Sequence, residues 1–203
     1  MDAQTFWAVI ARYNEETVPA QIFLLLFSLL AILLSYTDKV RWAAKFALGI
    51  TNLYIGFIFF ARYGTEPIQR YFALPLYLLC GTLFLYESWH SRNDPLQKPG
   101  RLVALLLSLY VLYPLVSVVL GARFPQMVTY IMPCPVVSLS IAVYAGYATR
   151  NKLLLALLSI WGLTGIKSVL FHAYEDVILL ICGIYGIVIL ANEIRASKRE
   201  KTS

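Results

Sequence analysis

Seven apolar stretches follow one another along the chain. Each has about 20 residues, enough to cross a hydrocarbon core of roughly 30 Å as an α-helix. Of the 203 residues, 60% are hydrophobic and only 14% are charged, whereas a soluble domain carries about a quarter charged residues. The sequence therefore predicts an all-α integral membrane protein, a bundle of seven transmembrane helices with the lipid bilayer as its first partner. The stretches are Val18–Tyr36, Ala43–Ala61, Phe72–His90, Leu102–Leu120, Gln126–Ala148, Leu153–Phe171 and Asp176–Ile194.

The boundary between the last two stretches rests on length, because residues 172–176 contain neither Gly nor Pro. An unbroken helix from Leu153 to Ile194 would be about 63 Å long, twice the bilayer core. The chain must therefore turn at this polar segment, where Asp176 is a natural N-cap for the last helix. The boundaries predict three parts: an interfacial N-terminal helix (1–17), a seven-helix transmembrane domain (18–194) and a basic tail (195–203).

The distribution of Lys and Arg predicts the orientation of the bundle. The loops after the first, third and fifth stretches, together with the C-terminal tail, hold 12 basic residues, against 5 on the opposite side. Because cytoplasmic loops carry an excess of Lys and Arg, the N-terminus is expected outside and the C-terminus in the cytoplasm. This topology explains the net charge of +6, and since no nucleic-acid-binding motif is present, nucleic acid is not expected as a partner.

Residues 3–13 predict a short amphipathic helix at the membrane surface, because their apolar side chains recur at helical spacing. Thr17 and Pro19 then predict the start of the first spanning helix. The segment Arg12-Tyr13-Asn14-Glu15-Glu16 is a candidate lid over the outer mouth of a site, with Arg12 and Glu15 as candidate ligand residues; an ordinary interfacial helix cap is the alternative. The apolar residues are Ala3, Phe6, Trp7, Ile10 and Tyr13.

A weak internal similarity relates the two halves of the chain. Residues 78–81 read Leu-Leu-Cys-Gly and residues 180–183 read Leu-Ile-Cys-Gly, while Pro19 and Pro125 open the first and fifth stretches. Three helices, a linker helix and three more helices form a pseudo-repeat plan that some small-solute transporters use. Chance similarity in apolar sequence is the alternative.

The turn before the last stretch concentrates ionisable residues in an otherwise apolar region: Lys167, His172, Glu175 and Asp176. Such groups are costly at or near bilayer depth and are candidates for function. Lys167 is expected to pair with one of the two carboxylates or to bind an anionic solute. The alternative is that its ammonium reaches the membrane surface while the carboxylates only cap the next helix.

Pro133-Cys134-Pro135 is the sharpest local feature of the fifth stretch. Neither proline has an N–H, so the carbonyls of Thr129 and Ile131 lose their helical donors. Within a membrane these carbonyls must find another partner, such as a neighbouring helix, a hydroxyl, water or an ion. The motif therefore predicts a helix break with a thiol that is a candidate ligand; a proline kink beside a buried Cys is the alternative.

Cysteines at similar depths in three stretches suggest a metal site. Cys80, Cys134 and Cys182, with His172 as a fourth ligand, would suit a soft ion such as Cu(I) or Zn(II). Nothing in the sequence brings the three stretches together at that depth, and free Cys is commonly a small buried residue.

Several short motifs resemble a bacterial family of small multi-pass membrane proteins that is known only as a domain of unknown function. They are Phe6 with Arg12-Tyr13-Asn14 and Pro19-Ala20-Gln21, then Pro133-Cys134-Pro135, and Glu175-Asp176 before the last stretch. The resemblance covers nearly the whole chain. It implies a multi-pass protein of the bacterial inner membrane and supplies no activity.

Three hypotheses of function follow. The leading one is binding or passage of a small solute or ion through an outward-opening polar site. The second is binding or transport of a soft metal (copper, zinc or mercury) by the intramembrane cysteines. The third is a non-catalytic accessory or scaffold subunit, with a homo-oligomer or a partner membrane subunit as its context. The chain lacks HExxH, GxSxG and paired catalytic carboxylates within the bundle, so an enzyme is not expected, nor any cofactor other than a soft metal ion.

Overall fold

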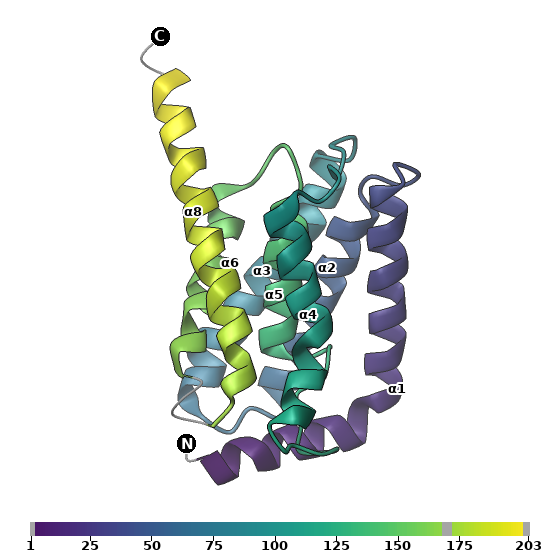
Figure 1. Ribbon diagram of the computed structural model, residues 1–203, viewed down its shortest axis with the longest axis vertical. Coiled ribbons are helices and arrows are strands. Elements are labelled where there is room, and N and C mark those ends of the chain that lie inside the picture. The colour runs from purple at the N-terminus through teal and green to yellow at the C-terminus, as the bar shows by residue number, and fades with distance from the viewer. Residues whose placement is uncertain (1–2, 168–171, 201–203) are drawn as a thin grey trace.

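The structure, a computed structural model, is a bundle of helices (Figure 1). It describes residues 3–167 and 172–200. Short π-helices, η1 (Ile55–Arg62) and η2 (Gln69–Ala73), and short 3₁₀-helices, η3 (Thr164–Lys167) and η4 (Tyr174–Asp176), extend several of the α-helices. The seven α-helices of the described residues are α1 (Ala3–Tyr36), α2 (Ala43–Tyr54), α3 (Leu74–His90), α4 (Arg101–Val119), α5 (Pro133–Tyr144), α6 (Lys152–Leu163) and α8 (Val177–Glu200).

Helix length and hydropathy indicate a multi-pass membrane protein. Five helical segments of the described chain are long and apolar enough to cross a bilayer. The prediction of an all-helical protein with seven helices is confirmed for the described residues, whereas a crossing by all seven stays a prediction. The five segments are Ala3–Tyr36, Ala43–Arg62, Gln69–His90, Arg101–Val119 and Tyr174–Arg199.

The predicted fifth stretch is wrong in its extent. Helix α5 begins at Pro133 instead of Gln126 and ends at Tyr144 instead of Ala148. The sixth stretch begins as predicted, but α6 ends at Leu163 and gives way to the tighter turn η3. The remaining residues of that stretch, 168–171, lie outside the described residues.

Helix α1 is one continuous helix, so the predicted helix start at Thr17 and Pro19 is not observed. Pro19 lies inside the helix. Its missing N–H and its ring disturb the preceding turn, and the Thr17 hydroxyl donates to the Tyr13 carbonyl at 2.6 Å. Both features favour a bend. Figure 1 shows the result: the N-terminal part of α1 crosses one end of the bundle, and the remainder runs along it.

Helix α5 lies at the centre of the bundle and contacts α2, α4, α6 and α8. Every residue of α5 except Cys134 is buried. This short helix therefore carries its sequence neighbours into the middle of the protein, where its N-terminal turn is available to a site.

Pairs of glycines let two pairs of helices approach closely. Gly49 of α2 faces Gly81 of α3, and Gly162 of α6 faces Gly183 of α8, with no room for a Cβ at any of these contacts. Small residues serve this purpose in membrane bundles. Gly81 and Gly183 are the last residues of the two Cys-Gly sequences that suggested a repeat. In each of them, the glycine therefore lies at a close contact between two helices.

One end of the bundle, opposite the segment of α1 that crosses it, is filled by a buried ion-pair cluster. Lys45 is 0% exposed, and its Nζ lies 3.5 Å from Glu87 Oε2 and 3.3 Å from Asp94 Oδ2. The same ammonium lies 4.3 Å from the ring centroid of Tyr147. Asp94 also accepts a hydrogen bond from the Thr149 hydroxyl at 2.7 Å. We call Lys45, Glu87, Asp94 and Tyr147 the far-end cluster.

Candidate functional site

Pro133, Cys134 and Pro135 open helix α5 instead of interrupting a longer one. Pro133 takes the first helical position, where its missing N–H costs nothing and its fixed φ suits the helix. Met132 before it is extended, with φ −131° and ψ 163°, as residues preceding proline prefer. The motif was therefore correctly identified as a discontinuity, but it marks a helix start.

The carbonyls around this start have found other partners, as predicted for Ile131. The Tyr13 hydroxyl of α1 donates to the Ile131 carbonyl at 2.6 Å. The Tyr77 hydroxyl of α3 donates to the Pro133 carbonyl, also at 2.6 Å. Because both hydroxyls and both carbonyls belong to buried residues, these bonds fix the N-terminus of α5 between α1 and α3.

Polar side chains of α1 hold the non-helical segment that precedes α5. The Asn14 amide donates to the carbonyls of Pro125 and Met127 at 2.8 and 2.9 Å. The Thr129 hydroxyl donates to Gln21 Oε1 at 2.7 Å. The sequence brought Asn14 and Gln21 forward only within the motifs of the family resemblance and predicted no contact for either side chain. Their recurrence with Thr17 on one face of a mostly apolar helix is the signal that could have found them.

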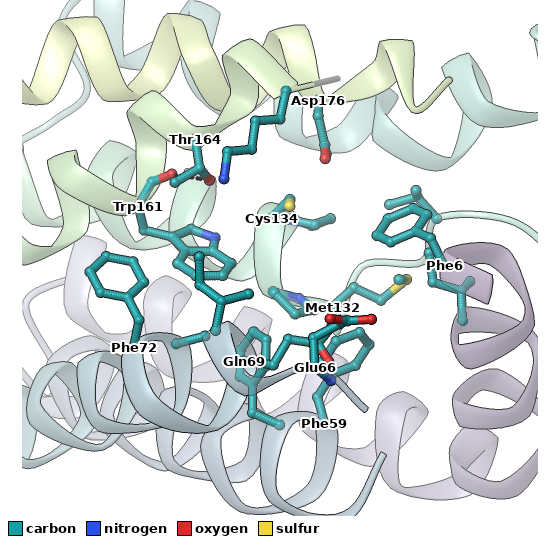
Figure 2. A pocket seen from close by; sticks show the side chains of 18 residues that line it. Phe6, Phe59, Glu66, Gln69, Phe72, Met132, Cys134, Trp161, Thr164 and Asp176 are labelled. Carbon is teal, nitrogen blue, oxygen red and sulfur yellow. Dashed lines mark hydrogen bonds between the residues drawn. The ribbon is translucent and has the colours of Figure 1, made fainter. Parts of the chain in front are cut away.

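A cavity of about 240 Å³ lies beside the first turn of α5. Its walls come from the crossing segment of α1, from η1, η2 and α6, and from the turn before α8, and they are mostly aromatic and aliphatic (Figure 2). The lining residues are Phe6, Ile10, Phe59, Phe60, Glu66, Ile68, Gln69, Phe72, Ala73, Val128, Met132, Pro133, Cys134, Pro135, Trp161, Thr164, Lys167 and Asp176.

Asp176 and Cys134 form one polar part of the cavity wall, and Glu66 and Gln69 lie across the space from them (Figure 2). The Tyr113 hydroxyl of α4 donates to Asp176 Oδ1 at 2.9 Å, and the Cys134 thiol adjoins the same carboxylate. In Figure 2, Cys134 lies between Trp161 and Asp176. The Trp161 indole N–H is buried near the Cys134 sulfur but makes no hydrogen bond of normal geometry.

Glu175 is buried behind the cavity and does not line it. It is 2% exposed, and the Ser117 hydroxyl of α4 donates to its Oε1 at 2.8 Å. The same Ser117 oxygen accepts the Val128 N–H at 3.1 Å. Glu175 thus connects the turn before α8 to α4 and to the segment before α5.

Lys167 lines the cavity from η3, and its side chain is exposed. Within the described chain it forms no ion pair with Glu175 or Asp176, although that pairing was one prediction from sequence. His172 does not line the cavity. It is exposed, has a positive φ of 55°, and its Nδ1 lies 3.2 Å from the Tyr174 hydroxyl.

Arg12 and Glu15 do not line the cavity. Arg12 pairs with Glu16 at 2.8 Å, and Glu16 also pairs with Arg62 at 3.0 Å, while Glu15 is exposed. The neighbours Phe6 and Ile10 contribute to the wall instead. The crossing part of α1 therefore borders the cavity, but through residues of its predicted apolar face and not through Arg12 and Glu15.

The cysteines do not form the predicted cluster. Cys80 and Cys182 are buried, and only Cys134 lines the cavity. Within residues 3–167 and 172–200, no three His, Cys, Asp or Glu side chains are placed to hold one metal ion. The geometry thus gives no support to a shared soft-metal site of Cys80, Cys134, Cys182 and His172.

A family model described as "Family of unknown function (DUF6064)" matches residues 3–201. The match spans nearly the whole chain, so the chain belongs to this family, and the resemblance inferred from sequence is confirmed. Neither the curated proteins nor the solved structures contain a match to the chain.

Proposed function

We propose that this member of the DUF6064 family binds a small amphipathic solute in the cavity beside α5 and carries it across a membrane. The observation that supports the proposal is the cavity itself: its walls are apolar, and Cys134, Asp176 and Lys167 supply polar groups at one side. Ligand sites typically combine such walls with a few polar groups that fix the ligand's orientation.

The discontinuity at Pro133 supports passage as well as binding. Secondary transporters place substrate sites at helices that are interrupted within the bundle, because free backbone groups and helix ends are available there. Irregular backbone at membrane depth is tolerated where it is buried in protein or lines a cavity. The segment before α5 meets both conditions through its bonds to α1 and its contribution of Val128 and Met132 to the wall.

We infer an outward-opening site in a bacterial inner membrane. The basic residues are concentrated in the connections at the far end and in the tail, which supports a cytoplasmic position for that end. The cavity then faces outside. We retain the predictions that the protein is not an enzyme and uses no cofactor other than a soft metal ion.

The first test is a thermal-shift panel of small polar and amphipathic solutes on the purified protein in detergent. A solute at about 100 times its dissociation constant stabilises the folded state by about 2.7 kcal/mol. The shift should be much smaller in Asp176→Asn, which removes the charge at the cavity. Asp38→Asn, the same change at an exposed site near the far end, should leave it intact.

A panel in which no solute shifts the unfolding temperature would contradict the proposal. That result would favour the accessory-subunit hypothesis, in which the lipid-facing helices matter and the polar turn is only structural. Co-purification of a membrane partner would then be the next measurement.

A further inference from the structure

Two neighbouring carboxylates at the cavity lack a cation among the described residues. Asp176 lines the cavity and is half-buried, and Glu175 next to it is 2% exposed. Among the described residues, neither forms an ion pair, and they receive hydrogen bonds from the hydroxyls of Tyr113 and Ser117. Carboxylates that are withdrawn from water without a cation create a site that favours positive charge.

Asp176 is held in position to meet such a charge. The Tyr113 hydroxyl fixes one carboxylate oxygen, and the first turn of α5, where the helix dipole is positive, lies beside it at Cys134. Both favour the ionised carboxylate, whereas burial and the neighbouring Glu175 oppose it. Lys167, in contrast, is exposed, and its long stem lets the ammonium reach solvent.

The walls opposite Asp176 are aromatic. Among the described residues, five aromatic side chains line the cavity: Phe6, Phe59, Phe60, Phe72 and Trp161. Figure 2 shows Phe6, Phe59, Phe72 and Trp161 arranged around the space into which Cys134 and Asp176 project. The faces of aromatic rings carry negative potential and attract organic cations, an effect that strengthens in desolvated sites.

We propose that the solute is an organic cation, an ammonium group on a compact apolar body. This inference rests on the proposed function and names the class of solute. The ammonium would contact the Asp176 carboxylate, and the apolar body would lie against the aromatic walls. The volume of about 240 Å³ exceeds the roughly 150 Å³ of a cavity that holds benzene and is below the range for drug-sized ligands. A benzylammonium-sized molecule therefore fits.

Three probes of matched size and shape test the inference: benzylammonium, benzyl alcohol and benzoate, which carry positive, zero and negative charge. Binding to wild-type protein is measured by titration calorimetry and by thermal shift at neutral pH. Benzylammonium should bind more tightly than both of the others. Asp176→Asn should weaken benzylammonium about tenfold or more, because it removes a charged hydrogen-bond partner, and should leave benzyl alcohol unchanged.

Two further variants separate charge recognition from unfolding. Lys167→Gln should tighten benzylammonium binding, since it removes an ammonium that repels the probe. Phe72→Leu keeps an apolar wall but removes a ring face, so it should weaken benzylammonium more than benzyl alcohol. If Asp176→Asn does not fold, the ranking of the three probes on wild-type protein still decides the charge preference.

Preference for benzoate, with loss of binding in Lys167→Gln, would overturn the inference while leaving the proposed solute site intact. Equal binding of all three probes would show an apolar cavity without charge recognition and would also overturn it. Failure of all three probes overturns it as well, and only a solute panel that is flat throughout would remove the proposed function too.

Discussion

At the scale of single residues, the amide of Asn14 determines whether the segment before α5 keeps its place. This side chain is fully buried and donates to two backbone carbonyls of a segment that lies more than 100 positions away in sequence. Carbonyls that are buried without a donor are costly. Asn14 also belongs to the Arg12-Tyr13-Asn14 motif on which the family resemblance rests, and its position gives that motif a structural explanation.

Asn14→Ala should lower the free energy of unfolding by about 1–3 kcal/mol, because it removes a donor from the half-buried Met127 carbonyl and one of the two donors of the Pro125 carbonyl, which keeps the Met127 N–H. The measurement is thermal or denaturant unfolding in detergent. Glu15→Ala, one position along the same helix but exposed, is the control and should change stability by less than about 0.5 kcal/mol. Equal effects of the two variants would contradict this role for Asn14.

At the scale of elements, the glycine contacts set the distance between α6 and α8 and between α2 and α3. At Gly162 and Gly183 the backbones of the two helices touch, and a Cβ on either residue would meet backbone atoms of the other helix. Backbone cannot move aside as a side-chain end can. The neighbouring η3 and η4, which carry Lys167 and Asp176, therefore depend on this contact for their position.

Gly183→Ala should destabilise the protein by about 1–3 kcal/mol through overpacking and should weaken solute binding as η3 and η4 are displaced. Both effects are read from thermal unfolding with and without a bound solute. Gly100→Ala is the matched control, because a Cβ at Gly100 meets nothing within 4 Å and its φ of −66° suits any residue. A Gly183→Ala protein with unchanged stability and unchanged solute binding would contradict the role of this close contact.

Hydropathy and proline chemistry predicted most elements but misjudged α5. Residues 126–132 are apolar enough to resemble membrane helix, and composition alone does not distinguish a helix from an extended segment buried in protein. The side chains of Tyr13 and Asn14 donate hydrogen bonds to the backbone carbonyls of this segment and hold it outside a helix, and only the folded chain brings these donors to it. Pro133, Cys134 and Pro135 were identified as a discontinuity because their effect is local.

Only part of the polar lining of the candidate site was predictable, and Glu66, Gln69 and Thr164 were not selected. Lys167 and Asp176 stood out because charge is rare in this sequence, and both line the cavity. The aromatic wall comes from α1, η1, η2 and α6, and single aromatic residues in an apolar chain give no signal until the helices are assembled. Glu175 and His172 were selected by the same rarity of charge and lie outside the lining.

At the scale of the whole molecule, the orientation rests on the basic residues, and one of them behaves unexpectedly. Lys45 was counted with the inner loops, yet it is buried in the far-end cluster. Setting it aside leaves 11 inner basic residues against 5 outer ones, so the predicted orientation is unaffected.

Cysteine labelling tests that orientation. In a Cys134→Ser background, with Cys80 and Cys182 buried, an impermeant maleimide should label Arg123→Cys on intact cells. Lys39→Cys should be labelled only after the membrane is permeabilised. Both native side chains are exposed, on connections at opposite ends of the bundle. The reverse labelling pattern would show that the end of the bundle with the cavity faces the cytoplasm.

The far-end cluster bears on how quickly a solute could traverse the bundle. The ammonium of Lys45 is fully buried and lies 3.3 to 3.5 Å from the carboxylates of Glu87 and Asp94, whose side chains are only 10% and 9% exposed, and separating opposite charges in such a site is expensive. On a path that crosses this cluster, each passage would require the ion pairs to part and re-form. Flux through such a protein would saturate with solute concentration and turn over one molecule per conformational cycle, as in a carrier, and an electrical recording would show no open-pore conductance.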